Sequence, residues 1–205
     1  MSAYSSRIYL ASQSPRYRDS LKQIGVSFEL LLLRNDPRRE FVLDEAWRES
    51  ETTSDYLERS CLAKAMAGQK AFLSRNLRAF PVLAADSIME LDGKIIGKPH
   101  DQKESVDILR QLSGRQHSLT SAVAVAFQDH MNCYVTTTIV TFGTLSEEKI
   151  ARYVIGNEGF DRSGAYAIEG LGGAFIKSIE GSHSALFGLP LFETVELLSN
   201  LAAPN

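Results

Sequence analysis

The sequence has little of what identifies several large protein classes. Only two of its 205 residues are cysteines, Cys61 and Cys133, and neither lies at zinc-ligand spacing from a histidine or from the other cysteine. A disulfide scaffold and a structural zinc site are therefore excluded, and a reducing, cytoplasmic location is expected. No apolar run approaches the length of a membrane span, and the first residues lack the apolar stretch of a signal peptide, so we expect no membrane association.

Strong charge and the common nucleotide and hydrolase motifs are missing as well. The formal net charge is only −3, which gives no electrostatic reason to expect a nucleic-acid polymer as a partner. There is no glycine-rich loop of the P-loop type and no G-x-S-x-G motif, which excludes the commonest nucleotide-binding fold and a serine-hydrolase elbow. The four histidines are scattered without metal-ligand spacing. A compact anion held by a few local cations is still compatible with this composition.

What the chain does contain is an alternation of strand-like and helical patterns. A hydrophobic content of 44% and a charged content of 23% suit a single globular domain over residues 1–205. Two hairpin signals, Asp92-Gly93 and residues 128–132, require antiparallel neighbours, so we predict an α/β fold with a mixed sheet rather than a purely parallel one. Strands are expected near residues 7–11, 26–33, 81–91, 117–127 and 133–142, and once more within 162–190. Helices are expected at residues 15–24, 54–75, 102–112, from 147 onward, and at 189–199, and the polar stretch 34–55 is expected to form a surface loop.

Hydroxyl and basic residues cluster where the first strand gives way to a helix. Ser14 followed by Pro15 is a helix-start signal, a serine cap and then proline at the first helical position. Backbone N–H groups at such a start, with Ser12, Arg16 and Arg18 nearby, can bind phosphate oxygens. The alternative is that Ser14 only caps the helix and both arginines are solvated.

Asp86 follows an apolar strand, at a position where ligands collect in α/β sheets. A carboxylate there can hold a divalent cation or take a proton from water, although a turn-forming aspartate is the structural alternative. The hydroxyl of Ser87 should face the opposite side of the strand.

Two lysines could add positive charge to the same kind of site. Lys98 in Gly97-Lys98-Pro99 lies at a strand end and could reach a phosphate as a point charge. Lys64 lies one turn after Ser60 on the long helix, on a semi-buried face where a cation should have a partner. For each lysine taken alone, a solvated surface position is the alternative.

Six motifs together resemble the Maf family of nucleoside triphosphate pyrophosphatases, from Ile8 to Leu198. They are LASQSPRYRDSLKQIG, LAADSI, IIGKP, LSGRQHSLTSAVA, RSGAYAIEGLGG and IEGSHSALFGLPL, in the order and spacing of that family. The resemblance implies a long bent mixed sheet with two lobes around a deep cleft, as in the inosine-triphosphate pyrophosphatases. It also implies a homodimer that uses Mg²⁺ or Mn²⁺ to hydrolyse a nucleoside triphosphate to the monophosphate and pyrophosphate.

The resemblance further assigns roles to residues of this chain. Asp86 matches the family's proton acceptor and metal-binding carboxylate. The positions that match residues lining the triphosphate cleft are Ser12, Ser14, Arg16, Lys64 and Lys98. An acidic residue that usually follows the second strand corresponds to either Asp36 or Glu40, and the sequence does not choose between them.

Three positions separate the substrate branches of the family, and here they are Arg16, Ser87 and Glu169. Arginine, a hydroxyl residue and glutamine mark the dTTP/UTP branch, whereas tryptophan, glutamine and glutamate mark the 7-methyl-GTP branch. The chain follows the first branch at Arg16 and Ser87 and departs from it at Glu169. Ionised glutamate only accepts hydrogen bonds, so it suits the N–H pair of a guanine edge. Tyr17 also stands where the family often has a second arginine, so whether Arg18 supplies that charge stays open.

From these residues we expect a dTTP/UTP pyrophosphatase. Hydrolysis of 7-methyl-GTP is the enzymatic alternative. A nucleotide-binding regulator of septum formation that does not cleave its ligand is the non-enzymatic one.

Overall fold

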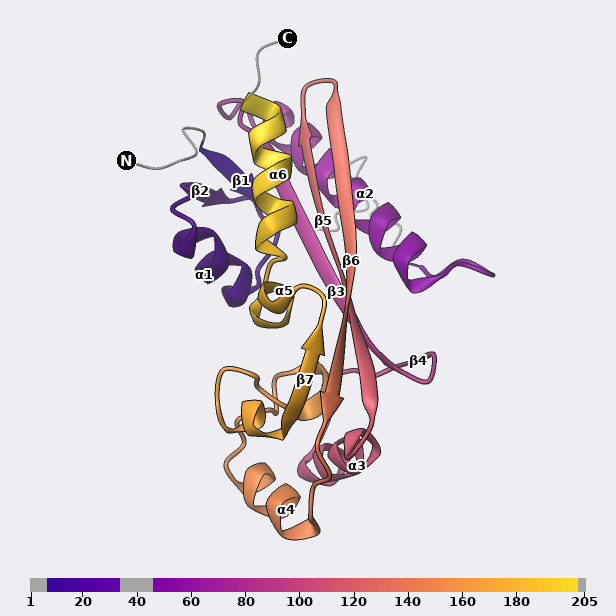
Figure 1. Ribbon diagram of the computed structural model, residues 1–205. Helices are drawn as coiled ribbons and strands as arrows, with labels where there is room; N and C mark the ends of the chain where they lie inside the picture. Colours follow the sequence, from indigo (N-terminus) through magenta and orange to yellow (C-terminus); the bar gives the residue numbers. More distant parts are fainter. Residues whose placement is uncertain (1–6, 34–45, 203–205) are drawn as a thin grey trace. The chain divides into compact units, whose positions relative to one another are not determined.

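The computed structural model of the protein describes residues 7–33 and 46–202, and the chain within it forms a mixed α/β fold (Figure 1). The strands are β1 (Ile8–Leu10), β2 (Phe28–Leu30), β3 (Val82–Leu91), β4 (Lys94–Ile95), β5 (Gln116–Phe127), β6 (His130–Phe142) and β7 (Ile176–Glu180). The helices are α1 (Pro15–Gln23), α2 (Thr53–Ser74), α3 (Gln102–Leu112), α4 (Glu147–Ile155), α5 (His183–Phe187) and α6 (Leu191–Ala202), with short 3₁₀ turns at Ser163–Ala165 and Leu171–Phe175. The expected strands and helices are confirmed in kind, but β3 runs through Asp86 and does not end before it. Helix α5 and both 3₁₀ turns were not foreseen. None of these helices, within the part of the chain that is described, is long and apolar enough to cross a bilayer.

All seven strands belong to one sheet in the order β2-β1-β3-β5-β6-β7, with β4 paired to β3. β1 runs parallel to both β2 and β3, while the β3–β4 and β6–β7 pairs are antiparallel. The prediction of a mixed sheet is therefore confirmed. The Asp92-Gly93 turn has positive φ at both residues, as a tight hairpin between β3 and β4 requires.

The chain forms two compact units, each with its own core. The first comprises residues 1–86, 121–136 and 188–205, and the second comprises residues 87–120 and 137–187. Strands β3, β5 and β6 contribute residues to both units.

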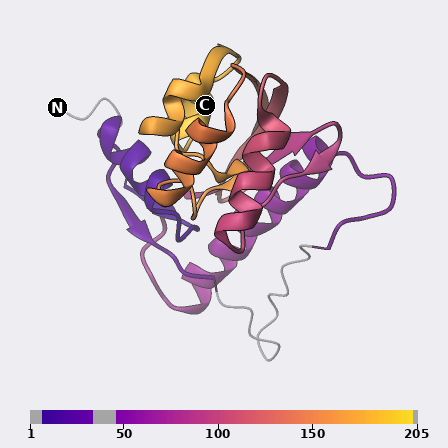
Figure 2. The ribbon, with the colours of Figure 1, turned by 90° about the horizontal axis from the view of Figure 1, so that it is seen from below.

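In the first unit, α1 packs beside the parallel β1–β2 pair, as Figures 1 and 2 both show. The buried side chains Tyr17 and Leu21 of α1 contact Ile8 and Leu10 of β1. They lie four residues apart and so share one face of the helix. Gly25, with φ of +71°, ends the helical run in the left-handed conformation that glycine adopts readily. This packing fixes the direction in which the chain leaves β1 and enters α1.

In the second unit, α3 and α4 pack on the parts of β3, β5 and β6 that belong to this unit. Their buried residues join one apolar cluster that also holds aromatic rings of the later part of the unit; its members include Leu109, Leu112, Ile150, Tyr153, Phe142, Tyr166 and Phe175. Asp101 caps α3, because its Oδ1 accepts the N–H of Glu104 at 2.7 Å, and Ser146 caps α4 in the same way. Both helices begin where the sequence analysis expects them, at residues 102 and 147.

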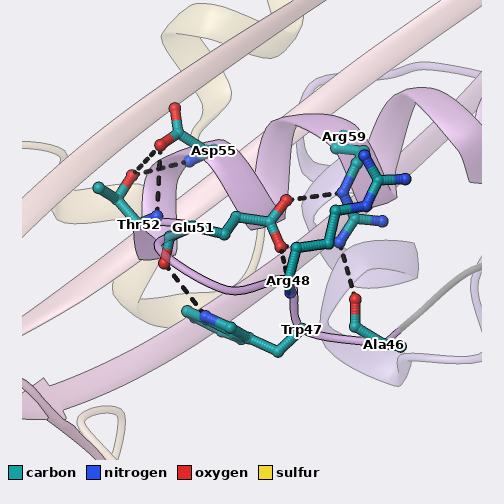
Figure 3. A network of polar contacts seen from close by, with 7 residues as sticks. All are labelled: Ala46, Trp47, Arg48, Glu51, Thr52, Asp55 and Arg59. Carbon is teal, nitrogen blue, oxygen red and sulfur yellow. Dashed lines mark hydrogen bonds and ion pairs between the residues drawn. The ribbon is translucent and has the colours of Figure 1, made fainter.

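Helix α2 begins with a dense polar network, drawn in Figure 3. Thr52 and Asp55 form a reciprocal capping box, in which each side chain accepts the other residue's backbone N–H. One turn further along, Arg59 donates from Nε to Glu51 at 2.6 Å and from an Nη to the carbonyl of Ala46 at 2.9 Å. The hydrogen bond from Arg59 lowers the pKa of Glu51 to about 2, so the pair stays charged. These contacts fix the chain that enters α2.

Candidate functional site

The functional residues predicted from the sequence divide between the two units, and each group is described by itself. The first unit holds Ser12, Ser14, Arg16, Arg18, Lys64 and Asp86. The second holds Ser87, Lys98 and Glu169.

In the first unit, the parallel pairing of β1 and β3 brings the start of α1 to the level of Asp86. Leu10 lies opposite Leu83, and the N–H of Ala11 donates to the carbonyl of Leu83 at 2.8 Å. Ser12 lies two residues beyond Leu10, and Asp86 lies three residues beyond Leu83. The serine-rich turn and the carboxylate therefore share one edge of the β1–β3 pair.

Ser14 occupies the position before α1, as predicted, but the predicted side-chain cap is wrong. The side chain of Ser14 makes no capping hydrogen bond. Instead, Oγ of Ser12 accepts the backbone N–H of Ser14 at 3.2 Å. Pro15 has no N–H and presets the helical φ by itself, so the helix can start without the serine hydroxyl. The Ser14 hydroxyl is consequently not used by a local cap.

Neither arginine of α1 is the fully solvated side chain that the alternative assumed, because both are half-buried. Arg16 lies where α1 meets Gly188: a Cβ added at that glycine would come within 2.9 Å of the Arg16 carbonyl oxygen. Ser20 supports the same contact by accepting the N–H of Leu189 at 3.1 Å. The Nε of Arg18 is buried and has no hydrogen-bond partner among the residues that the structure describes.

Lys64 and Asp86 form the central ion pair of the first unit. Nζ of Lys64 donates to Oδ2 of Asp86 at 2.8 Å, with side chains 15% and 39% exposed. The alternative of a merely solvated lysine is therefore wrong. Gly68, one turn along α2, makes this approach possible, because a Cβ there would lie only 2.5 Å from Cγ1 of Val82 on β3. The missing side chain lets α2 lie close enough to β3 for the lysine to reach the carboxylate.

The thiol beside this pair is not a nucleophile. Cys61 is fully buried and donates to the carbonyl of Ala122 at 3.7 Å. Burial, reinforced by the negative charge of Asp86, raises the pKa of Cys61, so the thiol stays protonated. Burial likewise raises the pKa of Cys133 to about 12.

In the second unit, the loop of Lys98 lies against the segment that contains Glu169. The N–H of Gly164 donates to the carbonyl of Gly97 at 3.2 Å, which joins the two segments. Lys98 is exposed, and no described residue forms an ion pair with it. Ser87 is half-buried in β3, directly after Asp86.

Glu169 is paired with an arginine that the sequence reasoning missed. Its Oε1 accepts a hydrogen bond from an Nη of Arg162 at 2.6 Å. The Arg162 side chain is only 18% exposed, against 42% for Glu169. Arg162 also donates from Nε to Asp161 at 3.2 Å. The carboxylate of Glu169, the residue that departs from the dTTP/UTP branch, is therefore paired with the positive charge of Arg162.

Two more missed residues, Glu158 and Tyr153, hold the backbone around Glu169. The carboxylate of Glu158 accepts the N–H groups of Leu171 and Gly172 at 3.1 and 3.2 Å, and also the hydroxyl of Tyr153 at 3.2 Å. The same hydroxyl accepts the N–H of Ala167 at 2.9 Å. The segment is thus tied on both sides of Glu169.

The glycines of this segment were the available sequence signal for that network. A Cβ at Gly170 would lie 2.4 Å from a carboxylate oxygen of Glu158, and one at Gly172 would lie 2.6 Å from the carbonyl of Ala167. The backbone contact leaves no room for a side chain at Gly172, whereas at Gly170 the Glu158 side chain would have to move, so glycine-rich sequence here indicated close approach. It did not indicate which side chains make the approach.

The described residues of the first unit supply only some of the ligands that a divalent cation needs. Among the described residues, no group of three or more histidine, cysteine, aspartate or glutamate side chains could hold a metal ion. Mg²⁺ bound for phosphate chemistry usually takes one or two carboxylates together with substrate phosphates and water, so Asp86 as the protein carboxylate fits that pattern. Asp36 and Glu40, the two candidates for a second acidic ligand, lie outside the described residues.

Hydroxyls and half-buried cations beside a carboxylate of β3, at the level where β1 leads into α1, define a protein of the class that binds small polyphosphate ligands. The chain belongs to the Maf-like protein family, whose profile matches residues 7–201. It is 42% identical over 205 residues to a dTTP/UTP pyrophosphatase of Aromatoleum aromaticum, covering 100% of both chains. It is 44% identical over 191 residues to one of Nitrosomonas europaea, covering 93% of this chain and 92% of the relative.

A third relative is the dTTP/UTP pyrophosphatase of Escherichia coli, 41% identical over 196 residues, with 96% of this chain and 93% of the relative covered. Among solved structures, the Staphylococcus aureus Ham1 protein matches 66% of this chain and 71% of its own, with 16% identity and a TM-score of 0.43.

Proposed function

We propose that the protein hydrolyses dTTP and UTP, and related modified pyrimidine nucleotides, to the nucleoside monophosphate and pyrophosphate. The single observation that supports this most is the Lys64–Asp86 pair at the level of the serine-rich turn. The pair combines a proton acceptor with a cation at the level of the Ser12 and Ser14 hydroxyls and the start of α1. Relatives 41–44% identical to the chain are named for the same reaction.

The reaction requires water to attack the α-phosphorus while the bond from that phosphorus to the bridging oxygen breaks. Asp86 takes the proton of the attacking water, and pyrophosphate leaves with the bond's electron pair. The charge on the non-bridging oxygens is stabilised by the Arg16 guanidinium, the Ser12 and Ser14 hydroxyls and the first N–H groups of α1. In the second unit, the exposed Lys98 is a further candidate phosphate-binding cation.

Lys64 has a second role besides phosphate binding. An ammonium group has three donors, and one of them is already directed at Oδ2 of Asp86. The lysine can therefore orient the carboxylate and still donate to a phosphate oxygen. Mg²⁺ or Mn²⁺ held by Asp86 together with the phosphates would supply charge neutralisation and a more acidic bound water.

Glu169 favours a second candidate, hydrolysis of 7-methyl-GTP, because a carboxylate matches the N–H pair of a guanine edge and a cationic ring. A nucleotide-binding regulator without turnover is the third candidate.

In the second unit, Ser87 and Glu169 are the proposed base-contacting residues. A homodimer and a cytoplasmic location stay predictions from the sequence, and sedimentation of the purified chain tests the former.

The test is pyrophosphate release from dTTP, UTP, 7-methyl-GTP, ATP and GTP, with Mg²⁺ or Mn²⁺ and with excess chelator. We expect turnover of dTTP and UTP that chelator abolishes. Preferential turnover of 7-methyl-GTP would overturn the pyrimidine assignment. Binding of the non-hydrolysable α,β-imido analogue of UTP without turnover of any triphosphate would overturn catalysis and leave the regulator.

A further inference from the structure

The ion pair between Arg162 and Glu169 differs from the other glutamate–arginine pairs of the second unit. In the Arg152–Glu148 pair of α4 both side chains are exposed to solvent, so that pair is expected to contribute little. Arg162 is mostly buried, and its guanidinium lies between the carboxylates of Asp161 and Glu169. The arginine therefore has a fixed position from which it meets Glu169.

Glu169 is also fixed from the backbone side. Glu158 binds the N–H groups of Leu171 and Gly172, and Tyr153 binds that of Ala167. Holding the backbone on both sides restricts where the Glu169 carboxylate can point. With Oε1 bound by Arg162, no described residue donates to Oε2, and the side chain remains partly exposed. This oxygen is the acceptor that the pair leaves open.

The chemistry of a pyrimidine base explains what such a pair can do. Uracil and thymine present the N3–H donor directly beside a carbonyl acceptor, so a matching site needs an acceptor next to a donor. A glutamine amide has both, whereas an ionised glutamate has acceptors only. A carboxylate bonded to a guanidinium again places acceptor and donor side by side.

We propose that Arg162 and Glu169 act together as the base-reading group of this chain, with Oε2 of Glu169 accepting from N3–H and the Arg162 guanidinium donating to the adjacent carbonyl. The proposal rests on the proposed function, because it takes Glu169 as a base-contacting residue. Arg162 also neutralises Glu169, which weakens the attraction of the carboxylate for a cationic 7-methylguanine ring. The pair thus offers the acceptor and the donor that a glutamine would offer at position 169.

The test compares four variants for pyrophosphate release from dTTP, UTP and 7-methyl-GTP. Arg162→Met leaves the carboxylate without its donor, so we expect kcat/KM for dTTP and UTP to fall ~10- to 100-fold, chiefly through KM, with a smaller loss for 7-methyl-GTP. In the double variant Arg162→Met/Glu169→Gln, the glutamine amide supplies both an acceptor and a donor, so most of the lost kcat/KM for dTTP and UTP should be recovered. Glu169→Gln alone should raise the ratio of kcat/KM for UTP to that for 7-methyl-GTP, because the amide no longer offers two acceptors to a guanine edge. Arg152→Met, which removes the exposed pair of α4, is the matched control and should behave as the wild type.

Equal losses for all three nucleotides in Arg162→Met, or no recovery in Arg162→Met/Glu169→Gln, would show a merely structural arginine and overturn the proposal. Titration of each variant with the α,β-imido analogues of UTP and 7-methyl-GTP separates this failure from that of the proposed function. If the wild type releases no pyrophosphate from any nucleotide, the proposed function fails. In that case the affinities for the two analogues test Arg162. A larger loss for the UTP analogue in Arg162→Met, recovered in Arg162→Met/Glu169→Gln, supports its role, and equal losses or no recovery overturn it.

Discussion

Nζ of Lys64 lies 2.8 Å from Oδ2 of Asp86, although one residue belongs to α2 and the other to β3. Lys64 is largely buried, while Asp86 keeps more of its surface open to solvent. Gly68 lets α2 pack directly on Val82 of β3, and this close packing brings the lysine within reach of the carboxylate. The pair therefore presents a carboxylate that is oriented from inside the protein and accessible from outside it.

Replacing Asp86 by asparagine should remove most turnover and leave the fold intact. The amide keeps the size of the side chain and an acceptor for Lys64 but cannot take a proton from water. We expect kcat for dTTP to fall ~10²- to 10⁴-fold, the range typical of a lost general base, with an unchanged thermal midpoint. Asp107→Asn, on an exposed i,i+3 pair with Arg110, is the control. Near-normal hydrolysis by Asp86→Asn would contradict the assigned role.

Replacing Lys98 by alanine should weaken substrate binding without destabilising the protein. Lys98 is exposed and forms no ion pair with a described residue, so its removal leaves nothing buried unpaired. The loss of one charge–phosphate contact should raise KM for dTTP roughly 10-fold and change kcat less. Steady-state kinetics at two salt concentrations measures this, since screening weakens a charge contact. Unchanged KM and kcat would exclude Lys98 from phosphate binding.

Replacing Glu158 by glutamine should loosen the segment that contains Glu169. The carboxylate accepts two backbone N–H groups and one hydroxyl, and an amide would direct an N–H₂ group at part of this set. We expect a loss of about 1–3 kcal/mol in unfolding free energy, measured by urea titration, together with a higher KM for UTP. Glu148→Gln, on the exposed pair with Arg152, should change neither quantity. Equal stability of the two variants would contradict the positioning role.

The stability of the protein should fall as the pH decreases from about 6.5 to about 4 because of His117. This side chain is buried, its Nε2 lies 2.9 Å from the Tyr166 hydroxyl, and its ring lies 5.0 Å from that of Phe142. Burial lowers the pKa of His117 from 6.5 to about 4, so in this range the unfolded chain binds a proton that the native protein does not. Above pH 6.5 both states are neutral and the effect vanishes, whereas below pH 4 it is complete at about 3 kcal/mol.

Urea unfolding at pH 7.5, 5.5 and 4.5 measures this slope, with His117→Gln as the comparison. Glutamine retains a hydrogen-bonding group for Tyr166 but does not titrate. The variant should be less stable at pH 7.5 and lose stability less steeply toward pH 4.5. Identical slopes for the two proteins would assign the pH dependence to other groups.

The order and type of most elements could be predicted because their signals are local. Asp101 and Ser146 start helices through bonds that span only three residues. Asp92-Gly93 sets a hairpin through its own backbone preference. Helix α5 is too short, at five residues, to produce a clear apolar period.

The capping function of Ser14 could not be predicted in the same way. The residue type and position favour a cap, yet Pro15 starts the helix without one, and the N–H of Ser14 is bound by Ser12 instead. The sequence around Ser14 is the same whether or not the serine side chain caps α1. Only the observed ψ of 120° and the hydrogen bonds distinguish them.

The sequence by itself determined the mixed α/β class, the starts of α3 and α4, and the candidate status of Asp86 and Lys64, because each of these depends on residue type and short-range spacing. Glu169 was singled out only by the resemblance to the family. The tertiary structure alone decided what those side chains meet. It paired Lys64 with Asp86, 22 positions away, and surrounded the Glu169 segment with Arg162 and Glu158. Such partners follow from how closely helices and loops pack, and that closeness depends on glycines such as Gly68 and Gly170 whose neighbours the sequence does not name.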